Sequence, residues 1–187
     1  KFNIEVGLRV ENTNIKEHQY GLTANDELEY KKSYTNIFPN IYTNYNISNN
    51  HSINFIFNRR IDRPNYQDLN PFIYVFDTYT YEEGNTALKP QFTNNLDVSY
   101  IYRNNYILDF YYNQIHNAII KSYETEEGSK RVYVMPANMS GNNSFGVRMQ
   151  IGHLDIGKIL KSSMSLTLIR KDYKWMDDNV LLTNSGT

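Results

Sequence analysis

The sequence has 187 residues and a formal net charge of −1, with 19 Lys and Arg against 20 Asp and Glu. This balance argues against a nucleic-acid-binding protein, which needs a basic surface to neutralise phosphates, and the absence of cysteine excludes disulfides, thiolate metal sites and a Cys nucleophile. No stretch approaches the roughly 20 consecutive apolar residues of a membrane-spanning helix. The chain contains 17 Tyr and 9 Phe but a single Trp, and Tyr is favoured where one end of a ring is apolar and the other wet. The composition therefore indicates that many side chains lie at a boundary between an apolar and an aqueous environment.

Apolar and polar residues alternate with a period of two in seven segments, as in half-buried β-strands. In the first of them Ile4 and Val6 alternate with Asn3 and Glu5. The seven segments are residues 2–11, 36–48, 52–61, 94–102, 106–119, 144–154 and 161–170. An eighth begins at Val180. The sequence therefore predicts an all-β fold, an antiparallel up-and-down meander of about seven to eight strands, with no helix.

The connections between these segments alternate strictly between short and long. The short ones are of hairpin length and cover residues 49–51, 103–105 and 155–158. The long ones cover residues 13–33, 62–90 and 120–134. In a meander this alternation collects all tight turns at one end of the sheet and all long loops at the other.

Two architectures fit this pattern. Outer-membrane barrels have short turns on one side, long loops on the other and an apolar outer face, and Tyr100, Tyr102 and Tyr106 flank a short turn, where an aromatic girdle would lie. A soluble β-sandwich that binds carbohydrate through its Tyr-rich face is the alternative, with the apolar faces packed on each other and the rings paired across strands. The direction of the apolar face distinguishes the two, because it points outward in a barrel and inward in a sandwich.

Specific strings of residues carry a family resemblance. They are NRRIDRPNYQDLNPF at residues 58–72, YEEGNTALKP at 81–90, VGLRVE at 6–11 and the Phe38-Pro39 pair. In this order they resemble the barrel of TonB-dependent outer-membrane receptors, in particular the Bacteroidetes-type outer-membrane β-barrel protein family. Thr86 stands where that family usually has Pro and Gln91 where it usually has Glu, and these departures concern the rigidity of a loop rather than the fold.

The resemblance implies part of a large transmembrane β-barrel in the outer membrane of a Gram-negative bacterium, in a receptor for a bulky nutrient such as a siderophore, haem, oligosaccharide or peptide. Residues 1–187 are expected to form a partial barrel domain that lacks the plug domain and the C-terminal closing strands, since such receptors have about 22 strands. The implied partners are outer-membrane lipid, the nutrient ligand, TonB and the plug domain through the parent receptor, and a surface lipoprotein. Any export signal is expected to precede Lys1.

Two local expectations concern the long loop at residues 62–90. Gly84, followed by Asn85, suits a tight turn with positive φ. The three arginines of the 58–72 string are expected either to pair with carboxylates such as Asp62 and Asp68 or to form a solvated cluster.

Catalytic and metal-binding patterns are missing from the sequence. The histidines His18, His51, His116 and His153 have neither HxxxH nor HExxH spacing, so no metal site is predicted. The paired carboxylates fall in loops, which makes a secreted glycosidase a distant third interpretation. There is no Gly-x-Ser-x-Gly nucleophile elbow and no Gly-rich phosphate loop. We therefore expect no catalytic residue, no cofactor and no enzymatic activity.

The longest loop supplies the residues that we expect to contact a ligand. Aromatic rings for stacking and polar groups for orientation are what a surface receptor needs. These candidate ligand-binding residues are Asn65, Tyr66, Tyr74, Tyr79, Tyr81, Glu82 and Glu83. The alternative is that the rings only pack the loop against its neighbours.

Overall fold

The structure is a computed structural model that describes residues 1–19, 28–125, 128–156, 160–177 and 180–186. These residues form ten strands and one short helix. The elements are β1 (Phe2–Gln19), β2 (Leu28–Ser48), β3 (His51–Asp62), α1 (Tyr66–Leu69), β4 (Tyr74–Val75), β5 (Thr80–Glu82), β6 (Gln91–Tyr102), β7 (Tyr106–Thr125), β8 (Val132–Ile156), β9 (Leu160–Asp177) and β10 (Val180–Gly186).

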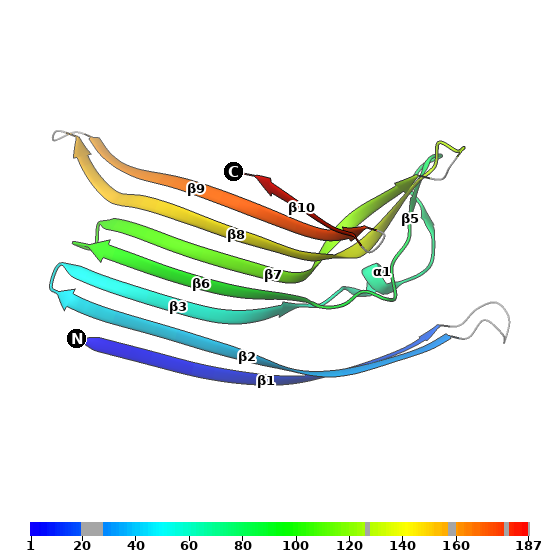
Figure 1. Ribbon diagram of the computed structural model, residues 1–187, viewed down its shortest axis with the longest axis horizontal. Helices are drawn as coiled ribbons and strands as arrows, with labels where there is room; N and C mark the ends of the chain where they lie inside the picture. Colours follow the sequence, from blue (N-terminus) through cyan, green and yellow to red (C-terminus); the bar gives the residue numbers. More distant parts are fainter. Residues whose placement is uncertain (20–27, 126–127, 157–159, 178–179, 187) are drawn as a thin grey trace.

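All strands belong to one curved sheet in which the long strands follow each other in sequence order (Figure 1). β1, β2, β3, β6, β7, β8, β9 and β10 pair antiparallel, each with the next. The predicted all-β meander is confirmed, and so is the eighth strand from Val180. The predicted turns at 49–51 and 103–105 lie at one end of the sheet, which we call the turn end. The turn predicted at 155–158 extends beyond the described residues.

The opposite end, which we call the loop end, differs from the prediction. β1 and β2 stay paired as far as Gln19 and Leu28, and β7 and β8 as far as Thr125 and Val132. The prediction of long links at 13–33 and 120–134 is therefore wrong, because most of those residues are hairpin extensions of the strands. Alternation of apolar and polar residues marks a half-buried strand, and it is absent from residues 13–19 and 120–125, which are mostly polar, and from 132–137, which are an unbroken apolar run. Backbone pairing continues there without that signal.

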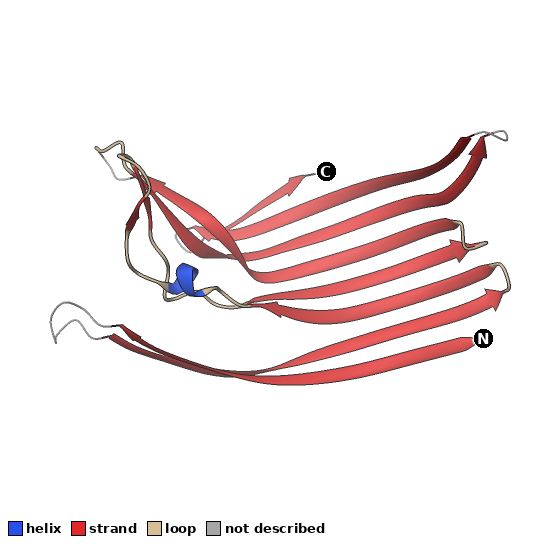
Figure 2. Ribbon diagram, turned by 180° about the vertical axis from the view of Figure 1, so that it is seen from behind, coloured by secondary structure: helices blue, strands red, loops and turns tan. Residues whose placement is uncertain are grey.

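The long connection between β3 and β6 is confirmed, but it is folded. It contains α1, β4 and β5, and β5 pairs in parallel with the start of β8, at Val132–Val134. Figure 2 shows these elements gathered at the loop end, away from the tight turns. The expectation of no helix is wrong for the single turn of α1. Among the described residues, no helix is long and apolar enough to cross a membrane.

The strand register divides the sheet into two faces, since residues directly opposite each other in adjacent strands point to the same side. One row across the sheet contains Phe55, Val98, Phe110, Val147 and Leu168. The adjacent row contains Asn54, Ser99, Asp109, Arg148 and Thr167. We call the two sides the apolar face and the polar face.

Burial distinguishes the faces further. Leu168 on the apolar face is 65% exposed, whereas Asp109 on the polar face is only 7% exposed, and the buried Phe38 and Tyr111 also lie on the polar face. The described strands form one sheet, so no second sheet covers the apolar face. The β-sandwich interpretation is therefore wrong, and the apolar face is directed outward as a barrel requires.

Candidate ligand-binding surface at the loop end

The loop of residues 63–90 has a small core of its own. Leu69 and Leu88 are buried, and Pro64 and Pro90 lie around the same small cavity together with Tyr34 of β2. On the strand side, the Lys32 ammonium group donates a hydrogen bond to the Leu88 carbonyl oxygen at 3.3 Å. The loop is thus packed against the β1–β2 hairpin extension.

The first candidate residues lie at α1. The Asn65 side chain accepts a hydrogen bond from the Asp68 N–H at 2.8 Å, and the Asp68 carboxylate accepts one from the Asn65 N–H at 3.3 Å. This reciprocal pair is a capping box, which fixes the start of a helix. Asn65 therefore has a structural role, and the cap holds Tyr66 at the surface, where it is 87% exposed.

Gly84 closes the loop over α1. Its N–H donates to the Asn70 carbonyl oxygen at 2.9 Å, and the next N–H, of Asn85, donates to the Asp68 carbonyl oxygen at 2.6 Å. A Cβ at Gly84 would overlap the Asn70 carbonyl oxygen and lie 2.7 Å from the Gln67 carbonyl oxygen. Gly84 is not among the described residues with positive φ, so that prediction is wrong. Glycine is needed here for close backbone approach instead.

A tight turn around Asp77 presents the aromatic residues of the loop. The Asp77 carboxylate accepts hydrogen bonds from the N–H groups of Tyr79 and Thr80, both at 2.7 Å, and from the Thr80 hydroxyl at 3.0 Å. These bonds to the charged form lower the pKa of Asp77 below its usual value. The turn holds the neighbouring rings of Phe76 and Tyr79 outward, 79% and 53% exposed.

The last candidate residues join the loop to the β7–β8 hairpin. The Tyr81 ring stacks on Tyr133 with 5.3 Å between centroids. Glu82 forms an ion pair with Lys121 at 2.9 Å, and the hydrogen bond from Lys121 to Glu82 raises the pKa of the lysine. The N–H of Glu83 donates to the Val134 carbonyl oxygen at 3.1 Å. These three residues thus hold the loop in place.

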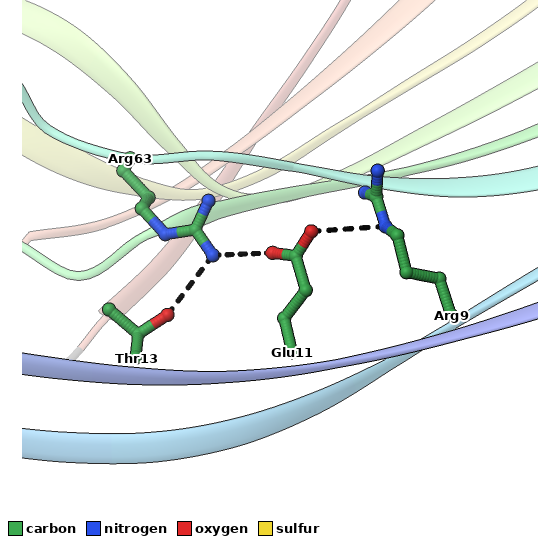
Figure 3. A network of polar contacts seen from close by, with 4 residues as sticks. All are labelled: Arg9, Glu11, Thr13 and Arg63. Atoms are coloured by element: carbon green, nitrogen blue, oxygen red, sulfur yellow. Dashed lines mark hydrogen bonds and ion pairs between the residues drawn. The ribbon is translucent and has the colours of Figure 1, made fainter.

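A second polar cluster holds the other side of the loop (Figure 3). The Glu11 carboxylate lies between two guanidinium groups, 2.6 Å from Arg63 and 3.0 Å from Arg9, and Arg63 also donates to the Thr13 hydroxyl at 3.0 Å. The hydrogen bond from Arg63 is the main cause that lowers the pKa of Glu11, and the same bond raises the pKa of Arg63. Arg63 therefore connects the end of β3 to β1 across β2.

The sequence predicted that Arg59, Arg60 and Arg63 either pair with carboxylates such as Asp62 and Asp68 or form a solvated cluster. Arg63 does pair with a carboxylate, but the partner is Glu11 rather than Asp62 or Asp68. Arg59 packs its guanidinium over the Phe92 ring, 5.0 Å from the centroid.

The candidate residues therefore separate into two groups. Tyr66, Tyr74 and Tyr79 are exposed rings, and the other four candidates support the loop through caps, pairing and ring stacking. The sequence-based selection also missed exposed apolar residues between α1 and β5. They are Phe72, Ile73, Val75 and Phe76. Their signal in the sequence is an apolar run without alternation inside a polar loop, and its exposure in the structure is typical of a binding surface. We call the exposed rings and apolar residues of 66–79 the loop surface.

The polar face of the sheet carries its own interactions. The Arg148 guanidinium lies 3.9 Å from the Asp109 carboxylate and 5.5 Å from the centroid of Tyr111. Side-chain amides bond across neighbouring strands, as in Asn44 to Asn54 at 2.6 Å. In the described part of the chain, no three His, Cys, Asp or Glu side chains are grouped so as to hold a metal ion.

Comparison with known proteins connects this geometry to a family. A model described as "Outer membrane protein beta-barrel family" matches residues 1–187. No curated protein sequence matches the chain.

Solved receptor structures share the fold. The siderophore receptor PirA from Pseudomonas aeruginosa is similar at 14% identity with a TM-score of 0.58, over 97% of this chain and 39% of that one. The ferric enterobactin receptor PfeA, from the same organism, is similar at 15% identity with a TM-score of 0.54, over 95% and 32%. The copper transporter OprC is similar at 13% identity with a TM-score of 0.58, over 95% and 30%. The chain thus spans well under half of each of these proteins, and the likeness concerns the fold alone.

Proposed function

Because the chain belongs to the outer membrane protein beta-barrel family, we propose that it forms part of the wall and the cell-surface loops of a receptor that takes up a bulky nutrient. The protein is located in the outer membrane, and its fold resembles that of TonB-dependent receptors. In such barrels the short turns face the periplasm and the long loops face the exterior. The turn end is accordingly periplasmic and the loop end extracellular.

The two faces of the sheet support a role as barrel wall. The row of Phe55, Val98 and Phe110 suits contact with lipid, while the polar row with Asp109 and Arg148 suits a hydrated or protein-filled lumen. In the proposed receptor, residues 1–187 are a partial barrel domain. The polar face contacts a plug domain that TonB acts on, and a surface lipoprotein is a further partner.

The folded loop is the observation that carries the proposed capture of a ligand. Its rings are exposed on a loop that is fixed by Gly84 and Asp77 and anchored through Arg63 and Glu82. A surface held in this way needs little further ordering when a ligand binds. Exposed rings on a rigid loop suit organic ligands with flat or apolar groups, and the proposed classes are siderophores, haem, oligosaccharides and peptides.

No enzymatic role is proposed for the chain. The similar proteins of known structure are named as receptors and a transporter, and the loop surface is built from rings and aliphatic side chains rather than from reactive groups. Binding followed by transport is the function that such a surface serves.

Uptake measurements with loop variants test this proposal. The native gene is expressed in a host without its own receptors, and uptake is measured with a ferric catecholate siderophore, a ferric hydroxamate siderophore, haemin, maltooligosaccharides and a peptide mixture. We expect TonB-dependent uptake of one of these probes. The variants Phe76→Ser and Tyr79→Ser should each lower uptake at subsaturating probe about tenfold, the effect of losing one aromatic anchor.

Conservative variants at the same positions are the control. Phe76→Tyr and Tyr79→Phe keep the rings and should retain uptake, while gel mobility before and after heating reports that every variant forms a barrel. Uptake that is unchanged in both serine variants would overturn the role of the loop surface, and TonB-independent uptake of every probe would overturn the receptor itself.

A further inference from the structure

A groove of about 400 Å³ lies at the turn end of the sheet, far from the loop surface. It is lined by the rings of the short turn together with apolar residues of β7 and β8. The lining residues are His51, Tyr100, Tyr102, Tyr106, Ile107, Leu108, Met149 and Gln150. The register places Tyr100, Leu108 and Met149 in one row of the apolar face, so the groove opens on the side that faces lipid.

Cationic and hydrogen-bonding groups gather at one end of this groove. His51 Nδ1 and the Tyr100 hydroxyl are hydrogen bonded at 2.6 Å, and the His51 ring lies 4.8 Å from that of Tyr102. The Arg103 guanidinium lies over the same Tyr102 ring, 5.2 Å from its centroid. The two turns that border the groove, SNNHS at 48–52 and YRNNY at 102–106, contain no carboxylate. In the neighbouring β8–β9 hairpin, Asp155 is paired in register with Lys161, so Arg103 leaves this end of the groove complementary to an anion.

The backbone at Arg103 points to a role for its side chain. Arg103 and Asn104 have φ of 51° and 54°, in the left-handed region. Asn adopts this region readily, but a bulky residue such as Arg does so at a cost. The hairpin would accept Asn or Gly at Arg103 with less strain. A strained residue that the turn does not require is a reason to look for a function.

We propose that the groove binds one phospholipid of the periplasmic leaflet, with its phosphodiester at Arg103 and His51 and an acyl chain along Tyr100, Leu108 and Met149. Arg is suited to phosphate because its fork of N–H groups matches two oxygens at once. A groove that is apolar along its length and cationic at one end matches the two parts of such a lipid. This site depends on the location of the protein in the outer membrane and is independent of which nutrient the receptor takes up.

Native mass spectrometry of the protein extracted from outer membranes tests the site. Delipidated protein is mixed with phosphatidylglycerol or with diacylglycerol of the same acyl chains, and the retained lipid is counted at rising collision energy. We expect one phosphatidylglycerol to stay bound after the others leave, with no such retention of diacylglycerol. Arg103→Asn removes the charge but suits the left-handed turn, so it should fold and bind phosphatidylglycerol about tenfold more weakly.

The matched control is Lys130→Gln, which removes one exposed positive charge near the loop end and should leave lipid retention unchanged. Equal retention of diacylglycerol would overturn the proposed phosphate contact, and so would unchanged binding by the Arg103→Asn variant. A polypeptide found in the groove in place of lipid would overturn the choice of ligand. Gel mobility before and after heating shows whether the Arg103→Asn variant forms a barrel, so that weaker lipid binding is not confused with misfolding.

Discussion

The replacement Gly84→Ala should release the loop of residues 63–90 while leaving the sheet intact. The added Cβ would overlap the Asn70 carbonyl oxygen and lie 2.7 Å from the carbonyl oxygen of Gln67. Both are backbone atoms, so the clash cannot be relieved by turning a side chain. The hydrogen bonds from Gly84 to Asn70 and from Asn85 to Asp68 would therefore be lost.

The size of the effect follows from those two bonds. A backbone hydrogen bond contributes about 0.5–1.5 kcal/mol net, so the free energy of opening the loop should fall by about 1–3 kcal/mol. Local opening controls amide hydrogen exchange, and every 1.4 kcal/mol corresponds to a factor of ten. Exchange in residues 66–90 should consequently accelerate by about 5–150-fold, while β6 and β7 keep the exchange of the unmodified protein.

Hydrogen exchange read by mass spectrometry on the detergent-extracted protein measures this. Gly7→Ala is the matched control, because a Cβ at Gly7 would meet the Asn40 Cβ at an ordinary 3.8 Å. Unchanged exchange of residues 66–90 in the Gly84→Ala variant would refute the reasoning. Equal acceleration throughout the sheet would show that the change unfolds the barrel rather than the loop.

Two further predictions concern the wall and the polar cluster at β1. Val98→Arg on the apolar face should lower the free energy of unfolding by about 2–4 kcal/mol, as measured by urea titration in lipid vesicles. Ser99→Arg on the polar face should lower it far less. Equal losses of unfolding free energy in the two variants would contradict the assignment of the faces. Because Arg63 lowers the pKa of Glu11, the bond between them stabilises the folded protein at pH values above 4.5, the ordinary pKa of this carboxyl group. This stabilisation is lost as the pH falls through the lowered pKa of Glu11. Spin labels on β1 and α1 should therefore show a distance that lengthens as Glu11 becomes protonated in acid, and a Glu11→Gln variant should show the longer distance already at pH 7. An unchanged distance in the Glu11→Gln variant would contradict the proposed link.

The sheet was predictable because its signal is local and repeated. Alternation such as that of Ile4 and Val6 places each strand residue on a face without knowledge of the neighbouring strand. Short turns such as 103–105 then fix the order and the register. The hairpin extensions beyond Thr13 and Ile119 lack this alternation, since residues 13–19 are mostly polar and residues 132–137 are an unbroken apolar run. Pairing with the partner strand is what defines them.

The loop was less predictable because its contacts join distant parts of the chain. Arg63 meets Glu11 across 52 residues, and no spacing rule selects Glu11 over the nearer Asp62. The close approach of Gly84 to α1 likewise depends on how the loop folds back. The sequence selected Tyr66, Tyr74 and Tyr79, which the structure shows to be exposed, and their contact with a ligand stays a prediction. The role of Glu82 as an anchor emerges only from its ion pair with Lys121.

The hairpin extensions explain how a long loop can present a fixed surface. The β1–β2 hairpin holds one side of the loop through the pair of Glu11 and Arg63, and the β7–β8 extension holds the other through the pair of Lys121 and Glu82. Both hairpins continue strands of the sheet, so the loop surface is tied to the sheet on two sides. A ligand that binds to a surface anchored in this way gains affinity from preorganisation. In the proposed receptor, the loop surface therefore serves to select and hold the nutrient.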